Sequence, residues 1–256
     1  MLFRSHLYNL HFVYANTGLE HEKTLEFVDK CDKHFDLNLT WVEAVISKKQ
    51  GVGTTYKVVD FESACRDNAI FKDMCSVYGL MNKDYIHCTR ELKNIPMAKY
   101  GKDIIGKHRI ALGIRHDEFQ RVKNRVDAIY PLATIIKKTK HDILAWWRNK
   151  PFDLDLEEHY GNCVGCYKKN HRKLKIIAEE NPQFFDPFIE LENSFACVNT
   201  KEEQGARQIY RYNRTAEEVK NNIKYPEEEE VLDECAEECG SMISDYISER
   251  AEARLF

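Results

Sequence analysis

Apolar and polar segments alternate along the first half of the chain and predict strands that alternate with helices. Residues 11–15 form a short apolar run that ends in the turn sequence Asn16-Thr17-Gly18, as a buried strand does. Apolar residues recur at helical spacing over 20–35, and residues 37–46 return to a strand-like composition. This order predicts a β-α-β unit.

The same alternation continues to about residue 187, after which the pattern is helical only. It predicts helices near 67–78, 87–100 and 139–150, a strand over 108–114, and then helices over 188–197, 215–223 and 229–254. Strands that alternate with helices imply a mostly parallel α/β sheet. We therefore expect an α/β domain over residues 1–187 and a helical extension with an acidic tail helix over 188–256.

Composition narrows the class of protein. The 256 residues are 43% hydrophobic and 31% charged, which excludes collagen-like, mucin-like and wholly disordered chains. No apolar run approaches the roughly 18 residues that a membrane span needs, and residues 1–6 lack the regions of a secretion signal. Nine cysteines, an odd number at irregular spacing, argue against a secreted disulfide scaffold. We expect a globular cytoplasmic protein with no membrane partner.

Charge is distributed unevenly along the chain. Residues 227–238 hold eight acidic side chains and no basic one, a pattern typical of a solvated helix face. Residues 1–226 carry 36 basic and 31 acidic side chains, a net charge of +5. A mildly basic body suits a phosphorylated small molecule better than duplex DNA, which requires a strongly basic face. The charge therefore disfavours nucleic acid as a partner.

The strongest chemical motif is a pair of cysteines three residues apart, Cys163 and Cys166. Gly161 and Gly165 beside them let the backbone fold tightly around one atom. Thiols at this spacing bind zinc or an iron-sulfur cluster, form a redox dithiol, or remain unligated, and the sequence leaves these alternatives open.

Cys88 is the best third ligand for such a site. Its predicted position at a helix start, beside Arg90 and Lys93, favours the thiolate. The alternatives for a fourth ligand are Cys197, His159, His171 and an exogenous group.

Two further segments can bind an anion. Arg115 follows Gly113 at the exit of a predicted strand, where a guanidinium can direct two donors onto a phosphate or sulfate; the alternative is a surface cluster of ion pairs. The turn over 16–18 opens a helix whose backbone amides can hold an anion. Its alternative is an ordinary capped turn, with Thr17 as N-cap and Glu20 three residues on.

Seven short motifs occur in the order typical of one protein family. They read Phe12-Val13-Tyr14-Ala15-Asn16-Thr17-Gly18, Trp41-Val42-Glu43, Val58-Val59-Asp60-Phe61, Cys88-Thr89-Arg90-Glu91-Leu92-Lys93, Gly113-Ile114-Arg115, Pro151-Phe152-Asp153-Leu154 and Gly161-Asn162-Cys163-Val164-Gly165-Cys166. Over about residues 9–214 the chain resembles the phosphoadenosine phosphosulfate reductase-like branch of the PP-loop superfamily, especially forms carried by bacteriophages. The resemblance implies a doubly wound α/β sheet with helices on both faces, which binds an adenine nucleotide in a bacterial cell or phage-infected host.

The resemblance also implies roles for individual residues. It places Asn16, Thr17, Gly18 and Gly113 at the pocket for ATP or a related nucleotide and Arg115 at its phosphate or sulfate end. Arg90 and Lys93 would line the same basic mouth, and Cys88, Cys163 and Cys166 would form the thiol site for an iron-sulfur cluster or zinc. The three cations would stabilise negative charge on a transferred group.

Two features depart from the family pattern. No Ser-Gly-Gly-Lys phosphate loop precedes Leu10, so we expect the loop to lie upstream, to come from another chain, or to have been lost. A sheet edge without its first strand invites pairing with a second copy or a partner chain. The reductase motif Glu-Cys-Gly-Leu-His is matched only in part by Glu238-Cys239-Gly240, in an acidic segment that disfavours a thiolate, so we treat this match as accidental.

These observations lead to a main hypothesis and two alternatives. The main one is an enzyme that binds an adenine nucleotide and handles sulfur or an activated sulfonyl or adenylyl group. The first alternative is a non-catalytic, phage-encoded interaction or assembly protein that keeps the scaffold without the phosphate loop. The second is a nucleic-acid sulfur-modification enzyme, which the small positive charge of the body disfavours.

Overall fold

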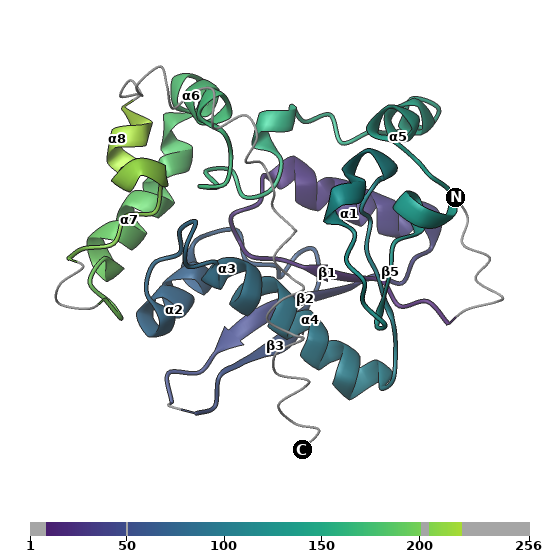
Figure 1. The fold of residues 1–256 in the computed structure, drawn as a ribbon, viewed down its shortest axis with the longest axis horizontal. Helices are drawn as coiled ribbons and strands as arrows, with labels where there is room; N and C mark the ends of the chain where they lie inside the picture. The colour runs from purple at the N-terminus through teal and green to yellow at the C-terminus, as the bar shows by residue number, and fades with distance from the viewer. Residues whose placement is uncertain (1–8, 50, 201–204, 222–256) are drawn as a thin grey trace. The chain divides into compact units, whose positions relative to one another are not determined.

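The computed structural model describes residues 9–49, 51–200 and 205–221 (Figure 1). These residues form two compact units. Unit 1 contains the described residues up to 103 together with those from 156 onward, and unit 2 contains residues 104–155. Both units combine helices with a small sheet, so the expected mixed α/β class is confirmed.

The sheet of unit 1 has three strands in the order β1-β2-β3. The strands are β1 (Val13–Ala15), β2 (Thr40–Ile46) and β3 (Thr54–Val59). β1 is parallel to β2 and is joined to it by helix α1 (Glu22–Phe35), which confirms the predicted β-α-β unit. β2 and β3 pair antiparallel as a hairpin whose loop contains Gly51 and Gly53, both with positive φ angles.

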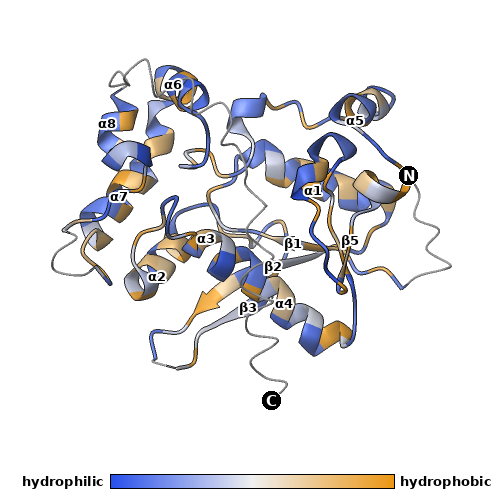
Figure 2. Ribbon diagram, in the orientation of Figure 1, coloured by the Kyte–Doolittle hydropathy of each residue, from blue (hydrophilic) through white to orange (hydrophobic). Residues whose placement is uncertain are grey.

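Helices make up most of the remainder of unit 1. They are α2 (Ala69–Tyr78), α3 (His87–Thr89), α4 (Ile95–Tyr100), α6 (His171–Glu180), α7 (Asp186–Phe195) and α8 (Ala216–Lys220). A π-helical segment, Arg90–Asn94, joins α3 to α4, so the helix predicted over 87–100 is continuous. Hydrophilic and hydrophobic residues alternate along α1 and α7, as expected of helices with one buried face (Figure 2).

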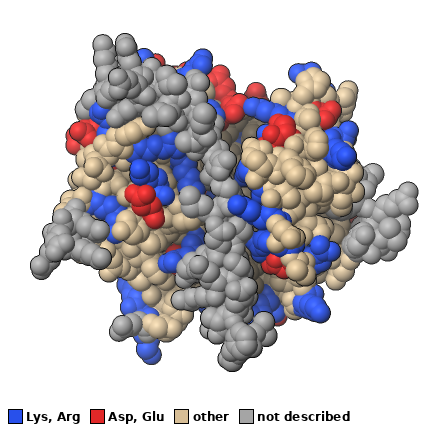
Figure 3. Space-filling view, viewed as in Figure 1, with Lys and Arg blue, Asp and Glu red and all other residues tan. Residues whose placement is uncertain are grey.

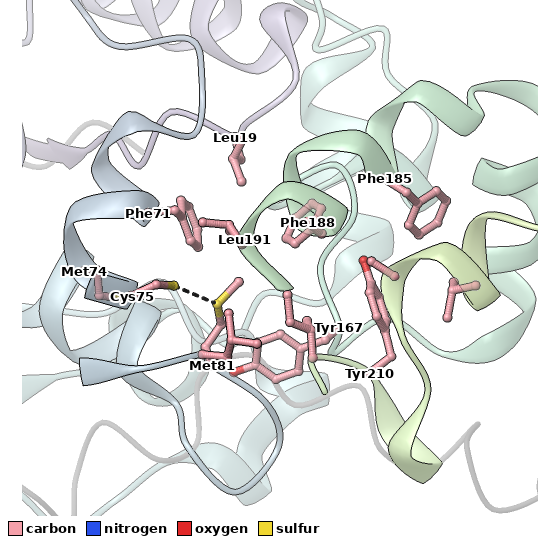
Figure 4. Close-up of a cluster of buried hydrophobic side chains, with 14 of the residues drawn as sticks. Leu19, Phe71, Met74, Cys75, Met81, Tyr167, Phe185, Phe188, Leu191 and Tyr210 are labelled. Atoms are coloured by element: carbon pink, nitrogen blue, oxygen red, sulfur yellow. Dashed lines mark hydrogen bonds between the residues drawn. The ribbon is translucent and has the colours of Figure 1, made fainter. Parts of the chain in front are cut away.

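The main hydrophobic core of unit 1 joins segments that are far apart in the sequence. Phe71 of α2 and Phe188 of α7 meet edge to face with ring centroids 6.5 Å apart, and Leu191 is fully buried beside them (Figure 4). Ala216 and Val219 of α8 belong to the same core. The expected boundary after residue 187 therefore falls inside α7, and α7 and α8 share a core with α2.

Unit 2 has a core of its own. It contains the two-residue parallel strands β4 (Ile110–Ala111) and β5 (Ala128–Ile129) and the helix α5 (Lys140–Trp147). A small cluster of buried residues, Ile114, Ala128, Tyr130 and Ala133, holds this unit together. The predicted start of α5 is confirmed, because Thr139 and Asp142 form a reciprocal capping box.

Some sequence predictions differ from the structure or lie beyond it. The strand expected over 108–114 is reduced to β4, and the strand pairing over 54–59 is antiparallel. The helix expected over 229–254, with Cys239, lies outside the described residues.

Within the part of the chain that is described, no helix is long and apolar enough to cross a membrane. Lys and Arg side chains are interspersed with acidic and uncharged ones on the face shown in Figure 3.

Candidate functional site

The turn that follows β1 is fixed by a buried amide. Asn16 is fully buried, and its Nδ2 donates hydrogen bonds to Glu43 Oε1 at 2.6 Å and to the carbonyl of Cys65 at 2.9 Å. Glu43, fully buried on β2, also accepts a hydrogen bond at 2.6 Å from the Cys65 backbone N–H. The Lys57 ammonium lies 2.9 Å from Glu43 Oε2 and partly neutralises this carboxylate, although it does not make a well-aligned hydrogen bond.

Gly18 ends this turn in a conformation that requires glycine. Its φ is +90°, and a Cβ atom at this position would lie 2.3 Å from the backbone oxygen of Asp67. Neither the angle nor the backbone contact tolerates a side chain. The residues after the turn enter α1 through His21, whose side chain accepts a hydrogen bond from the Lys23 N–H. His21 is therefore the N-cap of α1, and not Thr17 as in the alternative of an ordinary capped turn.

Replacing Gly18 by alanine is expected to lower the free energy of unfolding by about 2 kcal/mol or more, from positive-φ strain and the clash with Asp67. Gly113→Ala is the matched control, because Gly113 has no positive φ and a Cβ atom added there would meet no other atom within 4 Å. Urea unfolding of both variants measures the difference. Equal stability of the two variants would contradict the role assigned to Gly18.

Thr17, Glu20, Lys93 and Cys163, which we call the Thr17 cluster, meet beside this turn. Thr17 is buried and donates from Oγ1 to Glu20 Oε1 at 2.7 Å and from its backbone N–H to Glu20 Oε2 at 3.1 Å. Lys93 Nζ lies 3.6 Å from Glu20 Oε1, and Cys163 Sγ lies 3.5 Å from Thr17 Oγ1. Three segments that are distant in sequence therefore converge at the carboxyl end of β1.

Backbone contacts hold the cysteine segment at this place. Glu20 and Cys163 form an isolated antiparallel bridge, and the Val164 N–H donates to the Leu19 carbonyl at 2.9 Å. Gly165 lies against the core, where a Cβ atom would come 2.5 Å from Cε2 of Phe188. Gly165 thus lets the cysteine segment pack closely against the core.

Cys163 is a neutral thiol near physiological pH. The residue is half-buried but its sulfur is enclosed, and this burial, with a further contribution from Glu20, raises the pKa of the thiol to about 12. Lys93 opposes the rise only in part. Because Thr17 gives its hydroxyl proton to Glu20, the Cys163 thiol is the donor in its contact with Thr17.

Tyr14 adds a buried hydroxyl to this region. Its oxygen is inaccessible to solvent and has no hydrogen-bond partner among the described residues. Burial raises the pKa of Tyr14, and the charges of Glu20 and Cys163 add to the rise. A neutral phenol, a neutral thiol and a lysine thus lie around the Glu20 carboxylate.

The other predicted sulfur ligands lie in different surroundings. Cys88 Sγ lies 3.8 Å from the hydroxyl of Tyr167, and Cys88 contributes a small rise to the pKa of Cys163. Cys166 follows in the same turn as Cys163, and Cys197 is exposed after α7. Among the described residues, one set of three His, Cys, Asp or Glu side chains has ligand atoms within 4.8 Å of one another. It contains none of these cysteines. The cysteines in this arrangement do not fit a closed metal site, and we derive no chemical step through a metal.

Arg90 and Arg115 both pair with acidic side chains of the chain. Arg90 Nε donates to Glu91 Oε1 at 2.6 Å, and its guanidinium lies over the ring of Tyr78. Arg115 belongs to unit 2, where it forms two hydrogen bonds with Asp117, at 3.1 and 3.3 Å, and an ion pair with Glu118 at 3.3 Å. Arg115 thus takes part in the ion-pair cluster that the sequence offered as its alternative.

Three members of this site were not predicted as site residues. Glu43 had a signal in the sequence, since it is a lone charge within the apolar run of β2. Glu20 was interpreted only as part of a helix cap, and Tyr14 only as part of a strand. Glu20 pairs with Lys93, 73 residues away, and Tyr14 interacts electrostatically with Cys163, 149 residues away, so local patterns contain no signal for Glu20 or Tyr14 as site residues.

A phage-encoded protein is similar to this chain. The chain is 35% identical over 177 residues to the uncharacterized nin region protein ORF290 of Escherichia phage lambda. The matched residues are 67% of this chain and 61% of the lambda protein, so the chain spans less than two thirds of that protein's length. No family model and no solved structure matches the sequence. The expectation of relatives among phage-encoded proteins is confirmed by this similarity.

Proposed function

We propose that this chain is a phosphoadenosine phosphosulfate reductase-like protein that binds an adenine nucleotide at the carboxyl end of β1 and handles sulfur or an activated sulfonyl or adenylyl group there. The observation that carries the proposal is the Thr17 cluster, in which the turn after β1, Lys93 and Cys163 converge. Ligands of parallel α/β folds bind beyond the carboxyl ends of strands, and this cluster lies at such an end.

The chemistry of the cluster suits an anionic ligand next to a thiol. Lys93 is a half-buried cation that can exchange its contact with Glu20 for a phosphate or sulfate oxygen. The buried hydroxyl of Tyr14 would gain a hydrogen-bond partner from a polar ligand. In this proposal Lys93 stabilises charge on the ligand, and Cys163 supplies the sulfur closest to it.

The proposal includes a doubly wound fold and a thiol site that Cys88, Cys163 and Cys166 would form. β1 is paired on one side only among the described strands of unit 1, which favours pairing with a second copy or a partner chain. The protein would work in the cytoplasm of an infected bacterium. The resemblance implies a zinc or iron-sulfur cluster, which the arrangement of the cysteines does not fit, and metal analysis of anaerobically purified protein decides between the two.

Calorimetric titration with ATP and with adenosine phosphosulfates tests the nucleotide site. We expect micromolar binding of at least one of them, and we expect Lys93→Met to weaken it about tenfold or more, because the substitution removes a charge-assisted contact with the ligand. Lys99→Met on α4 is the matched control and should bind as the original chain does. Absence of heat with every adenine nucleotide would contradict the proposal.

One observation favours the alternative of a non-catalytic protein that keeps the scaffold. All three predicted anion-binding cations pair with acidic side chains: Arg90 with Glu91, Lys93 with Glu20 and Arg115 with Asp117. A ligand would have to compete with these carboxylates. The same titration decides between the two functions, since a non-catalytic scaffold protein would bind no nucleotide.

A further inference from the structure

A second group of ligand-type side chains lies outside the Thr17 cluster, where residues 157–160 meet the end of α6. His159 Nε2 is 3.2 Å from Glu157 Oε2 and 3.3 Å from Glu180 Oε2. One ligand atom from each of the three residues lies within 4.8 Å of the other two, a condition that this set alone meets in the described part of the chain. We call these residues the glutamate-histidine cluster.

We propose that the glutamate-histidine cluster binds a divalent cation of the first transition series, with Mn²⁺ and Zn²⁺ as the reference ions. Donor atoms about 2.1 Å from one metal lie about 3.0 Å apart at octahedral angles and about 3.4 Å apart at tetrahedral angles. Both distances from His159 Nε2 fall in this interval. Two carboxylates and a neutral imidazole also balance the charge of a divalent ion, and these donor types suit Mn²⁺ and Zn²⁺.

The surroundings of the cluster hold two of the three ligands in position. His159 is buried, with its ring 4.1 Å from the ring of Tyr160, centroid to centroid. The hydroxyl of Tyr160 donates to Glu180 Oε2 at 2.6 Å and accepts in turn from Nδ2 of Asn181. Such outer hydrogen bonds orient the ligands of metal sites. Glu157 is exposed and can close on the ion from solvent.

An open hollow of about 430 Å³ lies beside His159. It is lined by Glu158, His159, Asn170, Arg172, Lys173 and Ile176, so His159 is the one member of the cluster that borders it. Three protein ligands do not complete the coordination of these ions, so water or an exogenous group must supply the remaining positions. Water can reach His159 through this hollow.

A protonated His159 between two carboxylates is the competing explanation for the same distances. In that case the cluster is an ion pair and needs no metal. The two explanations differ in one measurable property, because only the metal site binds a cation stoichiometrically when the imidazole is neutral.

Titration of the full chain with Mn²⁺, followed by electron paramagnetic resonance of the free ion, tests the proposal. The protein is first treated with a chelator and kept reduced. Mn²⁺ is the probe because thiolates are poor ligands for it, so Cys163 and the other cysteines do not contribute to the binding. We expect one bound Mn²⁺ per chain and at least a tenfold weaker affinity in Glu180→Gln and in His159→Gln.

Two control variants make the result specific to this cluster. Glu179→Gln removes the same charge from the neighbouring exposed position of α6 and should leave the affinity unchanged. Cys163→Ser should also leave it unchanged, which separates this site from the proposed nucleotide site. Absence of stoichiometric binding, or an equal loss in Glu179→Gln and Glu180→Gln, would overturn the proposal. Circular dichroism of Glu180→Gln, whose side chain is half exposed, verifies that a loss of binding is not a loss of folding.

Discussion

Iodoacetamide is expected to modify Cys163 about a thousandfold more slowly in the folded protein than in the unfolded chain at pH 8, because only the thiolate reacts. Burial and the charge of Glu20 raise the pKa of this thiol from about 9 to about 12. The rate in the folded protein should increase as the pH rises toward 12, because the fraction of Cys163 thiolate grows as the pH approaches the pKa. Mass spectrometry of the peptide that contains Cys163, sampled over time at several pH values, measures both rates.

Two charge-removing substitutions should change this rate in opposite directions. Glu20→Gln should accelerate the modification, because the carboxylate raises the pKa of Cys163. Lys93→Met should slow it, because the ammonium lowers that pKa. A pair of shifts with the same sign would indicate altered access to the thiol and would contradict the electrostatic explanation, as would equal rates in the folded and unfolded chain.

Glu43→Ala is expected to lower the free energy of unfolding by about 3–5 kcal/mol, the second large effect. The substitution removes one acceptor of the Asn16 amide and the acceptor of the Cys65 backbone N–H, and it also removes the counter-charge of the Lys57 ammonium. Asn16 is fully buried, so its amide cannot replace the lost hydrogen bond with one to water. Chemical denaturation followed by circular dichroism measures the change.

Lys57→Met separates the ion pair from the buried hydrogen bonds. The Lys57 side chain is 53% exposed, so solvent screens its contact with Glu43 and its removal should cost less than about 1 kcal/mol. Glu43→Gln, which retains one acceptor oxygen, should fall between the two variants. If Glu43→Ala proved no more damaging than Lys57→Met, the carboxylate would not be what holds the turn after β1.

Local sequence patterns predicted the elements that depend on neighbouring residues. The helix expected over 20–35 and the start of the helix expected over 139–150 were confirmed, since both arise from contacts within a few residues. The hairpin partner β3 was not recognised as a strand of the sheet. Val58 on this strand is 58% exposed, so the alternation of apolar and polar positions that identifies a strand is weak there.

The position of the candidate site was partly visible in the sequence. The sequence indicated candidate site residues in the turn after β1, at Lys93 and at the cysteine pair, because their residue types are those that bind anions or metals. Their proximity was not visible. Lys93 and Glu20 are 73 residues apart, and Thr17 and Cys163 are 146 apart, so folding alone brings them together.

The sequence by itself determined the alternation of strands and helices in the first half of the chain, the glycine-dependent turn after β1 and the presence of thiols near its later loop. The tertiary structure decided the protonation of Cys163 and the meeting of Lys93 with Glu20. It also decided the meeting of Glu157, His159 and Glu180. The physical reason is the range of the forces: periodicity and turn preferences act between neighbours, whereas desolvation and charge interactions depend on every group that the fold brings near.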